Sequence, residues 1–182
     1  KEKTYEAVMR LGVVTDTQDM SGTVLSEVPE FQVAEEELRA VTESFAGDYM
    51  QVPPMYSALK VNGKKLYELA REGKTVERKP RPVHFYEIEI LDIDFPLVRF
   101  RVTCSKGTYI RTLCHDIGEK LGCGAAMETL LRTKVGRFTL DDAITLAQTE
   151  EAVRNGEIEQ RILGIEEILA EYPRVCCREE GD

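Results

Sequence analysis

The stretch Val98–Gly124 constrains the fold more than any other part of this sequence. Apolar residues alternate over 98–104, which predicts a strand, and after a short polar turn they recur at helical spacing over 110–121. We therefore expect a strand, a turn and a helix. Tyr109 and Arg111 would lie in the first helical turn, where free backbone N–H groups and the helix dipole favour an anion.

The ends of this predicted helix carry recognisable signals. Thr108 is placed to cap the first turn, and Gly122 is placed to end the helix. A simpler interpretation stays open on this pattern alone: the corner is structural, and its tyrosine and arginine only cover the edges of the core.

Periodicity elsewhere predicts a mixture of strands and helices. Tyr5 opens an alternating strand over 4–11, and the polar segment 15–22 is typical of a structured turn. The other expected elements are a strand over 23–28 that forms a hairpin, a helix over 35–45, a short helix that begins near Leu66 and is ended by Gly73, an extended arm over 74–82, a strand over 83–95 with a bulge near Ile90, and an acidic helix over 158–169. This order predicts an α+β fold with a mixed, mostly antiparallel sheet and flanking helices.

The charge is unevenly distributed along the chain. The net charge is −9, yet residues 60–81 hold 8 basic and 3 acidic side chains, and residues 99–137 hold 8 and 3. A folded protein presents local potential rather than its average, so a positive face for a polyanion is compatible with this composition. Ordinary solvated surfaces explain the same pattern about equally well.

The cysteines and the hydropathy indicate a cytoplasmic protein. Five cysteines without a framework spacing predict free thiols in a reducing compartment, and no apolar run approaches a membrane span. They are Cys104, Cys114, Cys123, Cys176 and Cys177. The spacing of Cys114, His115 and Cys123 matches no tetrahedral zinc site, so we expect no metal.

Four segments resemble one known family. The runs PPMYSALKVNGKKLYELAREG (53–73), CSKGTYIRTLCHDIGEKLGCGA (104–125) and LLRTKVGRF (130–138) are similar to the bacterial tRNA pseudouridine synthase B family, and so is the opening KTYEAVMRLGVVTDTQDMSG. The resemblance spans Lys3 to about Leu146. It implies the pseudouridine synthase fold, no cofactor, and isomerisation of uridine to pseudouridine in the TΨC loop of tRNA.

The resemblance also assigns roles to individual residues. Tyr5 corresponds to a strand tyrosine that stacks on the flipped uracil and is a candidate to take the C5 proton. Tyr109 and Leu130 correspond to residues that line the pocket and contact the target nucleotide. Arg111 corresponds to an arginine that pairs with the catalytic aspartate. Tyrosine and arginine suit the modification of an unstacked base. An aromatic face replaces the base stacking that is lost, and a guanidinium holds a carboxylate ionised.

One element of the family pattern is absent from this sequence. The nucleophilic aspartate of a G-x-L-D-P motif has no counterpart here. We therefore interpret residues 1–146 as part of a catalytic domain, with a basic RNA-binding insertion around 60–82. Residues 147–182 would form a helical segment and the start of a truncated C-terminal region of the PUA type. The strand pattern that begins at once with Lys1 suggests a piece of a longer protein, and we expect this piece alone to be inactive.

The basic residues gain an interpretation from the same resemblance. The side chains expected to bind the TΨC stem-loop are Lys60, Lys64, Lys65, Lys74, Arg78, Lys79, Arg81 and Arg132. Such binding would be led by phosphate contacts and would depend on salt. An alternative function from another class is a non-catalytic RNA-binding module that clamps or chaperones the TΨC arm.

Overall fold

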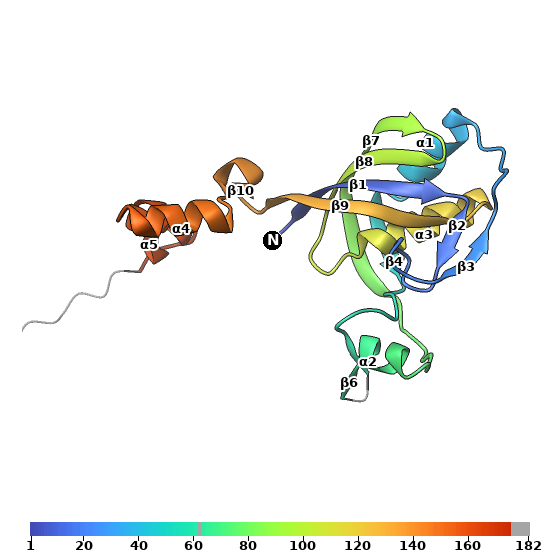
Figure 1. Cartoon of the computed structure of the whole chain (residues 1–182), viewed down its shortest axis with the longest axis horizontal. Helices are drawn as coiled ribbons and strands as arrows, with labels where there is room; N and C mark the ends of the chain where they lie inside the picture. Colours follow the sequence, from blue (N-terminus) through green and yellow to red (C-terminus); the bar gives the residue numbers. More distant parts are fainter. Residues whose placement is uncertain (62, 176–182) are drawn as a thin grey trace, which may run out of the picture. The chain divides into compact units, whose positions relative to one another are not determined.

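An antiparallel six-stranded sheet forms the frame of the protein in its computed structural model, which describes residues 1–61 and 63–175 (Figure 1). In spatial order the strands are β10 (Phe138–Thr139), β9 (Ala125–Val135), β1 (Lys3–Leu11), β8 (Leu97–Cys104), β7 (Arg81–Asp94) and β4 (Gly47–Gln51). The predicted α+β fold with a mostly antiparallel sheet is therefore confirmed. Each pair of neighbouring strands in this sheet is antiparallel.

Two helices cover one face of the sheet. α1 (Glu35–Glu43) and α3 (Ile110–Leu121) contact each other and share a buried cluster with β1 and β8. Met9, Phe100 and Leu113 are fully buried there, as the alternation in β1 and β8 and the helical spacing in α3 predict. This core fixes where the first turn of α3 lies relative to β1 and β8.

Smaller elements surround this frame. β2 (Val13–Thr15) and β3 (Val24–Glu27) form the expected hairpin, and β5 (Lys60–Val61) and β6 (Lys64–Lys65) form a second one that leads into α2 (Leu66–Arg71). In Figure 1, α2 and β6 lie beyond the end of β4, away from the main sheet. The basic segment is thus a small substructure attached to the sheet edge.

Residues Asp141–Asp182 form a second unit, described as far as Val175. It contains α4 (Leu146–Arg154), the 3₁₀ turn η2 (Ile158–Arg161) and α5 (Ile165–Ile168), and η1 (Leu140–Asp142) crosses the boundary between the units. The expected continuous helix over 158–169 is wrong. Gly164 lies in an extended conformation at the start of α5, which separates the two helical turns. The expected thiols Cys176 and Cys177 lie outside the described residues.

Several element boundaries also differ from expectation. The arm over 74–82 is shorter than predicted, because Arg81 and Pro82 already belong to β7 and pair with Gln51 and Met50 of β4. The predicted bulge in β7 is confirmed by a register shift between Ile90 and Asp92. The sequence periodicity did not predict β4, β9 or α4.

Candidate active site

A short turn between β8 and α3 positions Tyr109. Gly107 adopts φ = +89°, a left-handed value that glycine tolerates without strain. The Thr108 hydroxyl donates to the Ser105 carbonyl at 2.9 Å, and it does not cap the helix as predicted. Tyr109 itself is the extended N-cap residue, and α3 begins at Ile110. Tyr109 therefore precedes the first helical turn, while Arg111 lies within it.

Gln51, the last residue of β4, holds the backbone of Tyr109. Its side-chain oxygen accepts from the Tyr109 N–H at 2.8 Å, and its side-chain nitrogen donates to the Tyr109 carbonyl at 3.0 Å. Gln51 is only 2% exposed, so both bonds form away from water, where an unpaired polar group is costly. Tyr109 is thereby fixed relative to the sheet edge.

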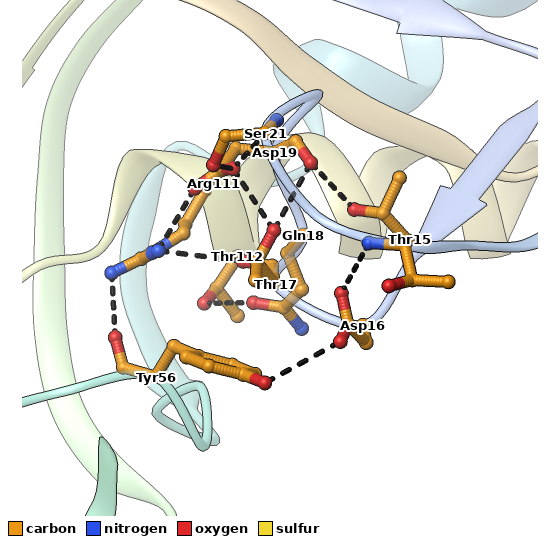
Figure 2. A network of polar contacts seen from close by, with 10 residues as sticks. Thr15, Asp16, Thr17, Gln18, Asp19, Ser21, Tyr56, Arg111 and Thr112 are labelled. Carbon is orange, nitrogen blue, oxygen red and sulfur yellow. Dashed lines mark hydrogen bonds and ion pairs between the residues drawn. The ribbon is translucent and has the colours of Figure 1, made fainter. Parts of the chain in front are cut away.

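The guanidinium of Arg111 joins two segments that are distant in sequence (Figure 2). Its Nη1 donates to Asp19 Oδ2 at 2.9 Å, and its Nη2 donates to the Tyr56 carbonyl at 2.7 Å. The Arg111 side chain is 24% exposed and that of Asp19 is 17% exposed. A partly desolvated, directional ion pair of this kind fixes the plane of the guanidinium.

Asp19 is prepared for this pairing by its own loop. Its Oδ1 accepts from the Ser21 backbone N–H at 3.1 Å and from the Thr17 hydroxyl at 2.9 Å. Burial by itself raises the pKa of Asp19, but the hydrogen bonds from Ser21 and Thr17 and the charge of Arg111 oppose it, and the net pKa is lowered. Asp19 is therefore a carboxylate at neutral pH.

The loop that carries Asp19 is docked on both β9 and α3. The Met20 N–H donates to the Met127 carbonyl at 2.9 Å, and the Met127 N–H donates to the Gln18 carbonyl at 3.0 Å. The Thr112 hydroxyl, one residue after Arg111, donates to Gln18 Oε1 at 2.7 Å. The structured turn predicted from its polar side chains is thus confirmed, and it is anchored on Met127 of β9 and on Thr112, the residue after Arg111.

Tyr5, Leu130 and Arg132 lie on the ladder between β1 and β9. Tyr5 is opposite Arg132, and Ala7 is opposite Leu130, so these side chains share the face on which α3 packs. Burial raises the pKa of Tyr5, and interaction with Arg132 lowers it to a smaller extent. Tyr5 therefore carries a neutral phenol at neutral pH. Leu130 is 43% exposed.

The residues predicted for catalysis and substrate binding thus form two groups. Tyr109 and Arg111 are adjacent at the start of α3, and Tyr5 lies with Leu130 and Arg132 on β1 and β9. Tyr5 also pairs with Val102 of β8, two residues before the end of the strand that leads to Tyr109. The β1–β8 ladder therefore connects the two groups.

The basic side chains differ in how they are paired. Glu72 contacts Lys74 at 2.7 Å and Lys64 at 3.6 Å, and Lys65 Nζ donates to the Tyr67 hydroxyl at 3.2 Å. Arg78 donates to the Pro53 carbonyl at 3.2 Å. The remaining members of the predicted set pair with no acidic side chain in the described part of the chain; they are Lys60, Lys79, Arg81 and Arg132.

Sequence reasoning missed Asp19, Gln51 and Tyr56. Asp19 lies in a turn whose side chains bond their own backbone, and that role alone accounts for an aspartate there. Gln51 and Tyr56 flank a proline pair, which indicates only that the segment is not helical. The expected partner of Arg111 was a carboxylate outside this sequence, whereas the structure already pairs Arg111 with Asp19.

Two negative findings concern residues 1–61 and 63–175. No helix there is both long enough and apolar enough to cross a membrane. Nor do these residues bring together three or more His, Cys, Asp or Glu side chains that could hold a metal ion. Cys104, Cys114 and Cys123 are buried free thiols.

Comparison with solved structures defines the class of protein. The chain superimposes on a crystal structure of a Cbf5–Nop10–Gar1 complex with a TM-score of 0.67 and 30% identity, covering 92% of this chain and 43% of that one. A second match is an H/ACA ribonucleoprotein bound to a substrate RNA containing 2′-deoxyuridine, with a TM-score of 0.58 and 27% identity, covering 88% and 38%. The fold is that of a pseudouridine synthase.

Sequence comparison gives the family. Residues 1–110 match the N-terminal domain of the TruB family of pseudouridylate synthases, and residues 111–170 match the C-terminal domain of tRNA pseudouridylate synthase B. The chain belongs to the TruB family. It is 51% identical over 172 residues to tRNA pseudouridine synthase B of Clostridium novyi, covering 94% of this chain and 58% of the relative. It is 46% identical over 175 residues to that of Clostridium tetani, covering 96% and 59%. The chain thus spans less than two thirds of the relatives it matches.

Proposed function

We propose that the protein containing this chain isomerises uridine to pseudouridine in the TΨC loop of tRNA, in the cytoplasm and without a cofactor. The observation that carries this proposal is the match of two TruB family domains over residues 1–170, together with curated relatives named tRNA pseudouridine synthase B. The buried free thiols of Cys104, Cys114 and Cys123 fit a reducing compartment.

The reaction defines what the site has to do. The bond between N1 and C1′ breaks, a bond between C5 and C1′ forms, and the proton lost from C5 is balanced by one gained at N1. The first step of this reaction would be the attack of a carboxylate nucleophile on the ribose or on the uracil ring. Because the G-x-L-D-P motif is absent from these 182 residues, we propose that this chain alone is inactive.

We assign Arg111 the role of orienting the nucleophilic carboxylate. Arg111 Nη1 donates to Asp19 and to the Thr17 carbonyl and Nη2 donates to the Tyr56 carbonyl, so a second carboxylate could be positioned against the remaining N–H groups of the guanidinium. Such fixed positioning is what nucleophilic attack requires. Tyr109, fixed by Gln51, would line the same pocket.

We assign Tyr5 and Leu130 to the unstacked base. A neutral phenol gives uracil a stacking face, and the exposed Leu130 two positions along the ladder would be covered by the target nucleotide. To take the C5 proton, Tyr5 would first have to lose its own. Arg132, which lowers the pKa of Tyr5, is the neighbour that favours this loss.

The basic substructure over 60–82 would bind the TΨC stem-loop, and residues 147–182 would lead into a C-terminal RNA-binding region. A second candidate function is a non-catalytic module that clamps the TΨC arm. Lys60, Lys79 and Arg81 line one cavity and pair with no acidic side chain in the described part of the chain, which favours RNA binding under either function. Catalysis is what separates the two.

The test is pseudouridine formation on a TΨC stem-loop, measured together with binding. We expect the full-length protein to bind and convert the RNA, and the 182-residue chain to bind it without conversion. Conversion by the 182-residue chain would refute the missing-nucleophile assignment. Binding without conversion by the full-length protein would establish the clamp.

A further inference from the structure

A groove lies between the loop that precedes α1 and the tip of the β7–β8 hairpin. It has a volume of about 710 Å³, which is within the range of ligand clefts in proteins. Its apolar lining residues are Pro29, Phe31, Val33, Phe95 and Pro96, and among the described residues that line it the only charged one is Glu30. The groove is therefore apolar inside, with a carboxylate at its surface.

Aromatic side chains join the two walls of this groove. Phe31 and Val33 are partly buried against the hydrophobic core, so the wall formed by the loop is anchored from below. The rings of Phe31 and Phe95 meet edge to face, with centroids 6.2 Å apart and an interplanar angle of 76°. Phe95 still exposes 43% of its surface, so an apolar side chain can pack on its ring.

The backbone holds both walls at the end of β1. The Val28 N–H donates to the Gly12 carbonyl at 2.8 Å, and the Leu11 N–H donates to the Pro96 carbonyl at 2.8 Å. Gly12 has φ = +78°, and a Cβ there would lie 2.7 Å from the Val28 carbonyl oxygen and 3.0 Å from the Phe31 ring. The groove is therefore formed before any ligand binds, which removes the cost of ordering it on binding.

The surface around the groove is acidic. Residues 11–38 and 82–98 supply both walls, and neither range contains a lysine or an arginine. Glu27, Glu30 and Asp94 are exposed, and they pair with no basic side chain in the part of the chain that the structure describes. The local potential is therefore negative, which attracts the cations of a partner and repels a phosphate backbone.

The groove is separate from the candidate active site. Leu11 lies six residues after Tyr5 on β1, which at about 3.3 Å per residue corresponds to about 20 Å. None of the residues assigned to base binding, catalysis or RNA contact lines the groove. A ligand bound there would leave the site at the start of α3 open.

The apolar lining and the acidic rim together define the occupant. Aromatic-lined grooves bind extended, proline-containing segments, and carboxylates beside such a groove pair with lysine or arginine of the same segment. A second copy of this chain is disfavoured, because an isologous contact through the groove would place two acidic rims against each other. We propose that this groove binds an extended segment of another protein, in which a proline or aliphatic anchor is flanked by lysines or arginines. This inference goes beyond the proposed function and does not depend on it.

The experiment measures binding of a fluorescently labelled synthetic peptide to the full-length protein by fluorescence anisotropy. The probe carries a proline–leucine–proline core between two pairs of arginines. Phe95→Ala should weaken binding about 10-fold, because it removes the exposed ring on which the anchor packs. Glu30→Lys should weaken binding about 5-fold, because it places a cation beside the arginines of the probe.

Matched controls carry the same changes outside the groove. Met50→Ala removes an exposed apolar side chain from β4, and Glu87→Lys reverses an exposed charge on β7, so both should leave peptide binding unchanged. Thermal unfolding of each variant checks that it is folded, and the surface substitution Glu30→Lys keeps the test decisive if Phe95→Ala does not fold.

Altered peptides separate the anchor from the charge. Replacing the arginines of the probe with glutamates should abolish binding, and replacing its core with glycine and serine should weaken binding about 10-fold. No binding of the probe, equal losses in groove and control variants, or a dimer of the protein that Glu30→Lys dissociates would each overturn the proposal. Pseudouridine formation by Phe95→Ala should equal that of the original protein, so failure of the groove leaves the proposed function standing.

Discussion

Arg111 and Asp19 are 92 residues apart in sequence, and their side chains meet at 2.9 Å. This contact joins the first turn of α3 to the loop after β2. The guanidinium also donates to the Tyr56 carbonyl. The ion pair therefore links the three segments that surround the start of α3. We infer that its purpose is to hold Arg111 in one orientation.

Asp19→Asn should reduce the rate of pseudouridine formation more than it reduces RNA binding. Asparagine keeps the shape of the side chain but loses the charge that fixes Arg111, and a displacement of about 1 Å at a reacting group can cost about 100-fold in rate. We expect kcat to fall on that order in the full-length protein, with Kd nearly unchanged. Asp16→Asn, which changes a neighbouring carboxylate that accepts from the Thr23 N–H, is the control. Equal effects of both variants on kcat would contradict the role of Asp19.

The stability of the protein should depend on the ionisation of Asp19. The folded-state pKa of this carboxyl lies below its ordinary value of 3.8, so its contribution is fully present above the pKa of the unfolded chain. It is lost as the pH falls through the folded-state value. At neutral pH the original protein should therefore have a larger free energy of unfolding than the Asp19→Asn variant. The difference in free energy between the two proteins should shrink in the acid range below pH 3.8. A constant difference across this range, measured by denaturant unfolding, would show that the charge contributes nothing.

Gln51→Leu should destabilise the fold and displace Tyr109. The substitution leaves both the N–H and the carbonyl of Tyr109 without their partner in a buried place, and we expect a loss of about 2–4 kcal/mol in the free energy of unfolding. Gln51→Glu retains the acceptor for the N–H and should cost less at acid pH, where its protonated carboxyl can also donate. If Gln51→Leu were as stable as the original protein, the paired hydrogen bonds would not be what holds Tyr109.

The lysines of the β5–β6 hairpin should contribute unequally to RNA binding. Lys64 is paired with Glu72 and Lys65 with Tyr67, whereas Lys60 and Lys79 pair with no acidic side chain in the part of the chain that the structure describes. Lys60→Gln with Lys79→Gln should therefore reduce the salt slope by about 1.4, the sum of two single-strand phosphate contacts. The double variant Lys64→Ala, Lys65→Ala should still weaken binding, but with a smaller change in slope. A larger change for the second pair would refute this ranking.

The corner between β8 and α3 could be predicted from sequence because its signals are local. Alternation in 98–104, helical spacing in 110–121 and the glycine at 122 each report on neighbours in the chain. β9 could not be predicted in this way. Its central residues Leu130 and Leu131 are both exposed, so the strand shows no simple alternation, and register shifts in its pairing with β1 break the pattern further.

The ion pair at the site was beyond sequence reasoning for a related physical reason. Asp19 reaches Arg111 because its two neighbours, Gln18 and Met20, bond the backbone of Met127 on β9, with Gln18 in a left-handed conformation at φ = +63°. That docking depends on a strand that the sequence pattern does not reveal. Resemblance supplied the candidate role of Arg111, but the partner that holds it is a property of the tertiary structure.

The most direct test of the central claim is Arg111→Ala in the full-length protein, assayed for both pseudouridine formation and stem-loop binding. If the guanidinium orients the nucleophilic carboxylate, kcat should fall by about 1000-fold while Kd changes by no more than about 2-fold, since the lost interaction acts in the transition state. Arg111→Lys should rescue little of the rate, because an ammonium cannot bind Asp19 and the Tyr56 carbonyl in the planar geometry seen here. Equal losses in kcat and in binding would contradict the account.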